Sequence, residues 1–154
     1  MNTFTAAVSG FAGITMLALT PALAADDTVT KTTTEPFADV AQAASDAIVN
    51  RGYTIDYHGF IGDMLKRTAA DVGATKELYK DAQFFTFCSA VVSRRVMEAD
   101  AVNIAYCPYV VFVYERADQP GTVTAGFRKL PAGNGRDEVN TLLTEIVEEA
   151  TGGL

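Results

Sequence analysis

The two cysteines of this chain, Cys88 and Cys107, are the residues whose types suit them best to chemistry. In an oxidising compartment a pair of thiols forms a structural disulfide, whereas two separate buried thiols act only as small apolar side chains. A pair can also be redox-active or bind a soft metal, but this pair lacks the typical C-x-x-C spacing. The sequence favours the structural disulfide and leaves the other interpretations open.

A copper site is the alternative that would use the most residues. Thiolate and thioether sulfur favour Cu(I), so Cys88 and Cys107 could bind it together with Met97 and the single histidine, His58. The spacing does not require such a site. His58 lies on the polar side of a predicted strand, and Met97 fits a core position on a predicted helix. The sequence therefore predicts no cofactor, with copper as the alternative.

Motifs for hydrolytic or phosphate chemistry are missing from the sequence. It contains no G-x-S-x-G, no H-E-x-x-H and no phosphate-binding glycine loop. With one histidine and no nucleophile near it, Ser-His or Cys-His catalysis has no support. Three acidic residues near the end, Glu145, Glu148 and Glu149, lie on the outer face of a predicted helix, where solvation explains them. We expect no enzymatic activity.

The first 24 residues have the pattern of a secretory signal peptide. They contain no Asp, Glu, Lys or Arg, and an apolar run at residues 11–19 is followed by Pro21 and the small-x-small triplet 22–24. We therefore expect export to the periplasm or the medium, and a single domain at residues 25–154. The net charge of −7 disfavours nucleic acid and anionic membranes as partners.

Hydrophobic periodicity predicts alternating strands and helices. Strands are expected at residues 27–34, 53–58, 82–89, 108–116 and 122–130, and a strongly amphipathic helix at 136–150. Further helices are expected after Pro36, around 61–65 and at 90–100. This order fits either a parallel α/β sheet or an antiparallel α+β sheet. Only antiparallel third and fourth strands would bring Cys88 and Cys107 to the same end of the sheet.

The third and fourth strands are apolar on both sides. Four helices, three of them short, are too few to cover both faces of a five-stranded sheet, so one aromatic face needs another cover. We expect a homodimer interface, with a cavity for a small apolar ligand or a tightly curled sheet as alternatives. The residues assigned to this face are Phe84, Tyr109, Val110, Phe112 and Tyr114.

The stretch "CSAVVSRRVMEADAVNIAYCPYVVFVYE", residues 88–115, resembles the bacterial and archaeal family "domain of unknown function 302". The matching features are Cys88 ending a strand, the closing of the next helix at 98–100, Pro108, and the apolar strand that runs into Tyr114 and Glu115. The resemblance covers about residues 28–130. It implies an α+β domain with an antiparallel five-stranded sheet, helices mainly on one face in a TATA-binding-protein-like arrangement, and frequent dimers.

Together these features predict an exported, non-enzymatic binding or accessory protein that uses its aromatic sheet face for dimerisation or for a small ligand. The alternative is a periplasmic thiol-redox or copper-handling protein that uses Cys88 and Cys107. The expected partner is a second copy of the chain, with an apolar small ligand as a further possibility. Nucleic acid is not expected, nor is a membrane once the signal peptide is removed.

Overall fold

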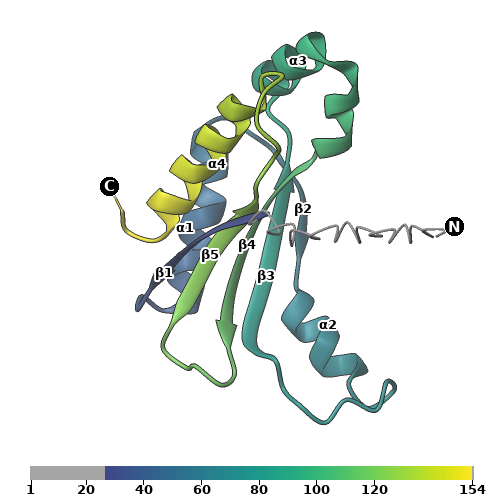
Figure 1. Ribbon diagram of the computed structural model, residues 1–154. Helices are drawn as coiled ribbons and strands as arrows, with labels where there is room; N and C mark the ends of the chain where they lie inside the picture. Colours follow the sequence, from purple (N-terminus) through teal and green to yellow (C-terminus); the bar gives the residue numbers. More distant parts are fainter. Residues whose placement is uncertain (1–26, 154) are drawn as a thin grey trace, which may run out of the picture.

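The computed structural model describes residues 27–153, which form one α+β domain around a five-stranded sheet (Figure 1). The strand order is β1-β5-β4-β3-β2, and every pair of neighbouring strands is antiparallel. The prediction of an antiparallel α+β sheet is therefore confirmed. The strands are β1 (Thr28–Thr33), β2 (Ile55–Gly59), β3 (Tyr79–Phe87), β4 (Tyr109–Arg116) and β5 (Val123–Arg128).

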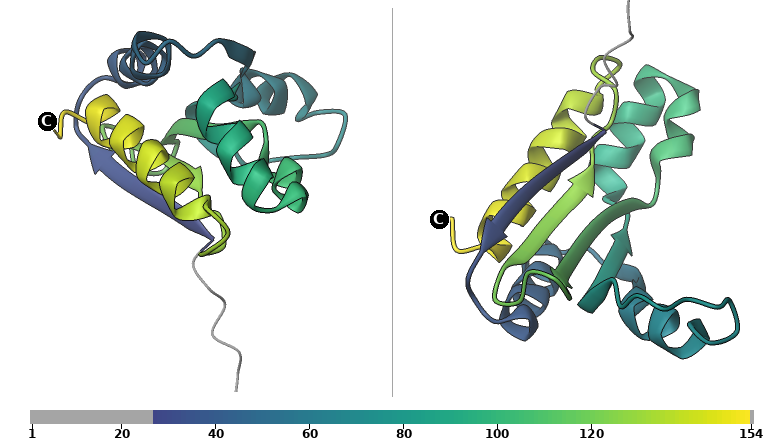
Figure 2. Two further views of the ribbon diagram at one scale, coloured as in Figure 1. Left: turned by 90° about the horizontal axis from the view of Figure 1, so that it is seen from above. Right: turned by 60° about the horizontal axis from the view of Figure 1, so that its bottom comes forward.

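Two long helices, α1 (Phe37–Asn50) and α4 (Arg136–Ala150), lie side by side against one face of the sheet (Figures 1 and 2). The shorter α2 (Ile61–Thr68) packs beside β3. Between β3 and β4 the chain forms α3 (Ala90–Ala99) and the 3₁₀ helix η1 (Ala101–Tyr106). The predicted signal peptide, residues 1–24, lies outside the described residues. Within residues 27–153, every helix is too short or too polar to cross a membrane.

The core lies between the sheet and the pair α1 and α4. Both helices bury residues at spacings of three and four, which place one apolar stripe of each helix against the sheet. The sheet contributes every second residue of its central strands, because successive side chains of a strand point to opposite faces. The largest fully buried side chains include Ile48, Phe85, Phe87, Val111, Val113, Phe127, Leu143 and Ile146.

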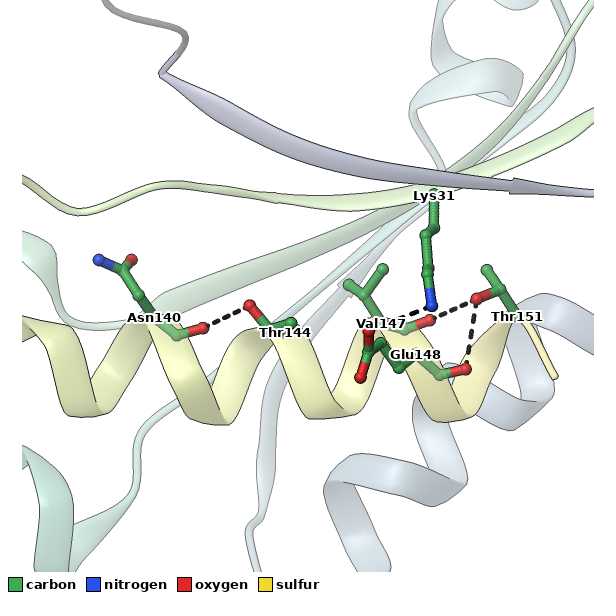
Figure 3. A network of polar contacts seen from close by, with 6 residues as sticks. All are labelled: Lys31, Asn140, Thr144, Val147, Glu148 and Thr151. Carbon is green, nitrogen blue, oxygen red and sulfur yellow. Dashed lines mark hydrogen bonds and ion pairs between the residues drawn. The ribbon is translucent and has the colours of Figure 1, made fainter. Parts of the chain in front are cut away.

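Polar contacts fix α4 to the edge of the sheet (Figure 3). Lys31 of the edge strand β1 donates to Glu148 at 3.1 Å, which joins the two elements. At the end of α4, the Thr151 hydroxyl donates to the Val147 carbonyl at 2.9 Å, and the chain turns at Gly152 with φ 76°. The two side chains of the ion pair are 44% and 39% exposed, so the pair orients β1 rather than adding much stability.

The sequence pattern did not predict η1. Asp100 ends α3 in an extended conformation, and its side chain accepts a hydrogen bond from the Val102 backbone at 3.1 Å. This capping bond starts η1 at Ala101, in a stretch where the apolar residues of the sequence continue toward β4. The apolar side chains of Val102 and Ile104 are consequently exposed on the surface.

Candidate functional site

Cys88 and Cys107 form a disulfide, with 6.2 Å between their Cα atoms. Cys88 directly follows β3, and Cys107 lies two positions before β4. Because the strands are antiparallel, with Phe87 opposite Tyr109, both sulfurs lie at the same end of the sheet. The predicted pairing is confirmed, and it is compatible with an oxidising compartment. Ser93 of α3 lies beside the disulfide, with its Oγ 3.8 Å from Cys107 Sγ.

The four residues considered for copper do not gather around these sulfurs. His58 lies opposite Phe85 on β3, three residues before Cys88, which is about 10 Å by strand rise. Met97 lies on α3 beside Arg94 and Glu98. Within residues 27–153, no group of three or more His, Cys, Asp or Glu side chains is positioned to hold a metal ion.

One face of the sheet is not covered by α1 or α4. We call this the aromatic face; it carries Phe84, Val110, Phe112 and Tyr114, with Tyr57 on the edge strand β2. The Phe112 and Tyr114 rings are stacked at 6.1 Å, and the Tyr57 and Phe84 rings are 5.7 Å apart. All of these residues are partly or largely exposed.

Tyr109 does not belong to the aromatic face, so its assignment to that face is wrong. It is 2% exposed on the helix-covered side, where its hydroxyl accepts a hydrogen bond from Ser93 at 3.1 Å. Burial raises the pKa of Tyr109, although the bond to Ser93 acts in the opposite direction. Residues 109 and 112 are separated by an odd number of positions, so their side chains point to opposite faces.

Two glycines let the aromatic rings lie flat on the sheet. The space that a side chain at Gly59 would occupy is filled by the Phe84 ring, and the space at Gly126 is partly filled by the Phe112 ring. Each glycine is on a strand next to that of its ring, and the register places them directly opposite. The rings therefore cover the glycine backbone and leave less apolar surface exposed than their size suggests.

An apolar groove borders the aromatic face where α2 approaches the sheet. Its volume is about 520 Å³, and its walls come from Ile61 and Leu65 of α2 and from Phe84, Phe112 and Tyr114 of the sheet. Leu78, 51% exposed, lies at the same end. The groove extends the apolar surface of the aromatic face beyond the strands.

A second hollow lies on the helix-covered side, between the first turns of α1 and the sheet. We call it the polar cleft; its volume is about 710 Å³. His58 Nε2 lies 2.8 Å from Gln83 Oε1 within it. Glu115 is buried there and accepts hydrogen bonds from the Gly121 backbone at 2.8 Å and from Lys80 at 3.0 Å. The sequence pattern did not predict this cleft, although Glu115 interrupts the inward apolar series of β4.

The crystal structure of an uncharacterized conserved protein, DUF302, from Bacillus stearothermophilus is similar to this chain. The TM-score is 0.65 with 13% sequence identity, over 82% of this chain and 99% of that one. The chain has the DUF302 fold. This agrees with the family resemblance of residues 88–115. No family model matches the sequence, and neither does any curated protein.

Within this DUF302 fold, Glu115 is expected to make stability depend on pH. The Gly121 backbone N–H and then the Lys80 ammonium lower the pKa of Glu115 below its usual value of 4.5. Because the folded-state pKa is the lower one, the stabilisation is complete above pH 4.5 and is lost as the pH falls through the folded-state pKa. We expect Glu115→Gln to be less stable than the wild type at pH 7 and to lose less stability on acidification.

Urea unfolding at pH 7, 5 and 3.5 measures this difference. The matched control is Glu145→Gln, which removes an exposed carboxylate of α4 and should follow the wild-type pH dependence. The pKa of Asp118 is also lowered, by its pairing with Arg116, but that pair is present in all three proteins and cancels in the comparison. If the free energy of unfolding depended on pH in the same way in Glu115→Gln and in the wild type, Glu115 would not be the source of this pH dependence.

Proposed function

We propose that this chain is an exported, non-enzymatic binding module of the DUF302 family, and that its aromatic face binds a second copy of the chain. Export is supported by the signal-like residues 1–24 and by the disulfide between Cys88 and Cys107, since disulfides persist in oxidising compartments. The family assignment is supported by the residue pattern and by the shared fold.

The observation that carries the proposal is a continuous apolar surface that α1 and α4 leave uncovered and that α2 only borders. Phe84, Phe112 and Tyr114 form its centre, and the groove beside α2 extends it. Contiguous apolar patches of this kind on soluble proteins commonly mark interaction sites. Aromatic residues are also enriched in protein interfaces, where they contribute much of the binding energy.

Size and charge favour a second copy as the occupant. Five strands about 4.8 Å apart and about 25 Å long give a face of roughly 600 Å², near the roughly 800 Å² that each partner buries in a standard interface. The middle of the face carries Phe84, Thr86, Phe112 and Thr124, all uncharged, so the net charge of −7 does not oppose self-association there. A twofold dimer places the same face on both sides of the interface.

Size-exclusion chromatography with light scattering tests the dimer. We expect the wild type to be dimeric at micromolar concentration, and Tyr57→Glu or Phe112→Gln to weaken the dimer at least tenfold, because each places a polar group in an apolar interface. Tyr57 is 60% exposed, so its replacement should leave the monomer folded. The control is Val91→Glu, an equally exposed apolar residue on α3, which should leave the dimer intact.

Two results would contradict the proposal. One is a wild type that stays monomeric at millimolar concentration. The other is a dimer that survives both substitutions on the aromatic face but dissociates in Val91→Glu, which would move the interface to α3 and η1.

The alternative function, thiol redox chemistry, has the disulfide in its favour. Cys88 and Cys107 are both only partly buried, so a thiol reagent can reach the bond. A regulatory or catalytic disulfide would be reduced at the potential of a glutathione buffer, whereas a structural one resists it.

A further inference from the structure

The polar cleft lies on the opposite side of the sheet from the aromatic face and has no part in the proposed dimer. Three adjacent strands each place a polar side chain on this helix-covered side: the exposed His58 on β2, the partly buried Gln83 on β3 and the buried Glu115 on β4. The register brings them together, because His58 is opposite Phe85 and Asp81 is opposite Glu115. They are separated by 25 to 57 positions in the chain and meet only through strand pairing.

Gln83 and Glu115 stand where the core pattern calls for apolar side chains. The inward series of β4 runs Tyr109, Val111 and Val113 and then changes to Glu115. On the antiparallel strand β3, Gln83 precedes the buried Phe85 and Phe87 and lies at the same end of the sheet as Glu115. An apolar residue at either position would extend the core beneath α1, whereas a buried polar group costs stability unless it is hydrogen-bonded. Departures of this kind from the folding pattern are expected at functional sites.

The shape of the cleft suits a small molecule with an apolar part. Its volume of about 710 Å³ falls in the range of ligand sites. Aromatic rings form one continuous row inside it: His58 lies 4.3 Å from the Phe85 ring and 4.3 Å from the Phe60 ring. Phe60 is 48% exposed and forms part of the lining together with Phe37.

The charges of the cleft favour a cation. Its lining contains three carboxylates, Glu35, Asp81 and Glu115, but a single ammonium group, that of Lys80. The whole chain carries a net charge of −7, so its field also attracts cations and repels anions. Aromatic faces add to this preference, because the electron-rich face of a ring attracts an ammonium group.

We propose that the polar cleft binds a small organic amine, with its ammonium group at the carboxylates of Glu115 and Asp81 and its apolar part against the Phe85 and Phe60 rings. In the free protein the Lys80 ammonium group pairs with the Glu115 carboxylate, and a ligand ammonium group would displace it. Its side chain is 58% exposed on a flexible stem, so it can move into solvent when the ligand enters.

An NMR titration of the purified protein with two matched probes tests the proposal. The probes are 2-phenylethylamine, a cation, and 3-phenylpropanoate, an anion of similar size with the same ring. We expect the amine to shift the backbone signals of Phe60, Gln83 and Glu115 and to bind at least tenfold more tightly than the acid. Equal binding, tighter binding of the acid, or no saturable shifts with the amine would overturn the proposal.

Charge-neutralising variants then locate the site. Glu115→Gln should weaken amine binding about tenfold and Asp81→Asn several-fold, whereas the control Glu145→Gln, on the outer side of α4, should leave it unchanged. Asp81 is partly exposed and its pairing is through the backbone, so Asp81→Asn gives a folded variant even if Glu115→Gln does not. The proposed amine site would also be refuted if folded Asp81→Asn bound the amine as tightly as the wild type, or if Glu145→Gln lost as much affinity as the cleft variants. The dimer test uses the other face, so each proposal can fail independently.

Discussion

Removing the disulfide is expected to lower the free energy of unfolding by about 3 kcal/mol. Cys88 and Cys107 are 19 positions apart, and opening a loop of that length in the unfolded chain restores about this much conformational entropy. The enclosed segment, α3 and η1, depends on the bond more than the rest does, because it contributes few residues to the core, chiefly Val92 and Val96. The loss of stability should therefore be largest in α3 and η1.

The measurement compares urea unfolding of the oxidised wild type with that of the double variant Cys88→Ala, Cys107→Ala. In thermal unfolding, the melting temperature of the double variant should lie about 10 °C below that of the oxidised wild type. Strong reductant should shift the wild type to the same stability and leave the double variant unchanged, which controls for the effect of the substitutions themselves. A difference below about 1 kcal/mol would contradict the structural role. Reduction of the wild type by a glutathione buffer would instead favour the redox alternative.

The arrangement of strands and helices followed from local signals in the sequence. The amphipathic stripe of α4, with residues such as Leu143 and Ile146, predicted a helix against a core, and the structure buries that stripe. The direction of the strands was not contained in the periodicity, because alternating strands and helices fit two topologies. The family resemblance supplied the antiparallel arrangement. That arrangement permits the pairing of Cys88 with Cys107, which the expected oxidising compartment favoured and which the structure shows.

The faces of β4 were harder to predict from sequence. When both faces of a strand are apolar, hydrophobicity does not show which side meets the helices. Tyr109 and Phe112 were assigned to one face for this reason, although their positions in the strand place them on opposite faces. The glycines under the rings give a better signal: Gly59 and Gly126 lie beneath Phe84 and Phe112, on the uncovered side.

The polar cleft was inaccessible to sequence reasoning because it depends on register. A bulge between Tyr79 and Asp81 in β3 contains Lys80, whose ammonium group pairs with Glu115, and no local pattern predicts the position of this bulge. His58 was placed on the polar side of its predicted strand, and its side chain is exposed. In the structure it points to the helix-covered side, where the first turns of α1 leave room for the cleft.

Replacing Gly126 with valine is expected to destabilise the protein by about 3 kcal/mol or more. Gly126 is buried in β5 between β1 and β4, and a Cβ atom there would lie 2.5 Å from the Val29 carbonyl oxygen and 2.7 Å from the Phe112 ring. The ring can rotate away, but the carbonyl belongs to the paired backbone of β1 and can move only if that pairing is disturbed. Overpacking against fixed backbone is among the costliest substitutions. Urea unfolding measures the loss.

Gly59 provides the matched comparison, because the nearest atoms to an added Cβ there all belong to the Phe84 side chain. Gly59→Ala should destabilise the protein, and the further change Phe84→Leu should recover part of that loss, since the smaller side chain makes room. In the Gly126 case, Phe112→Leu should recover little, because the clash with the Val29 carbonyl remains. A double-mutant cycle at each pair measures the coupling between glycine and ring. Full rescue of Gly126→Val by Phe112→Leu would show that the ring, and not the backbone of β1, requires glycine at this position.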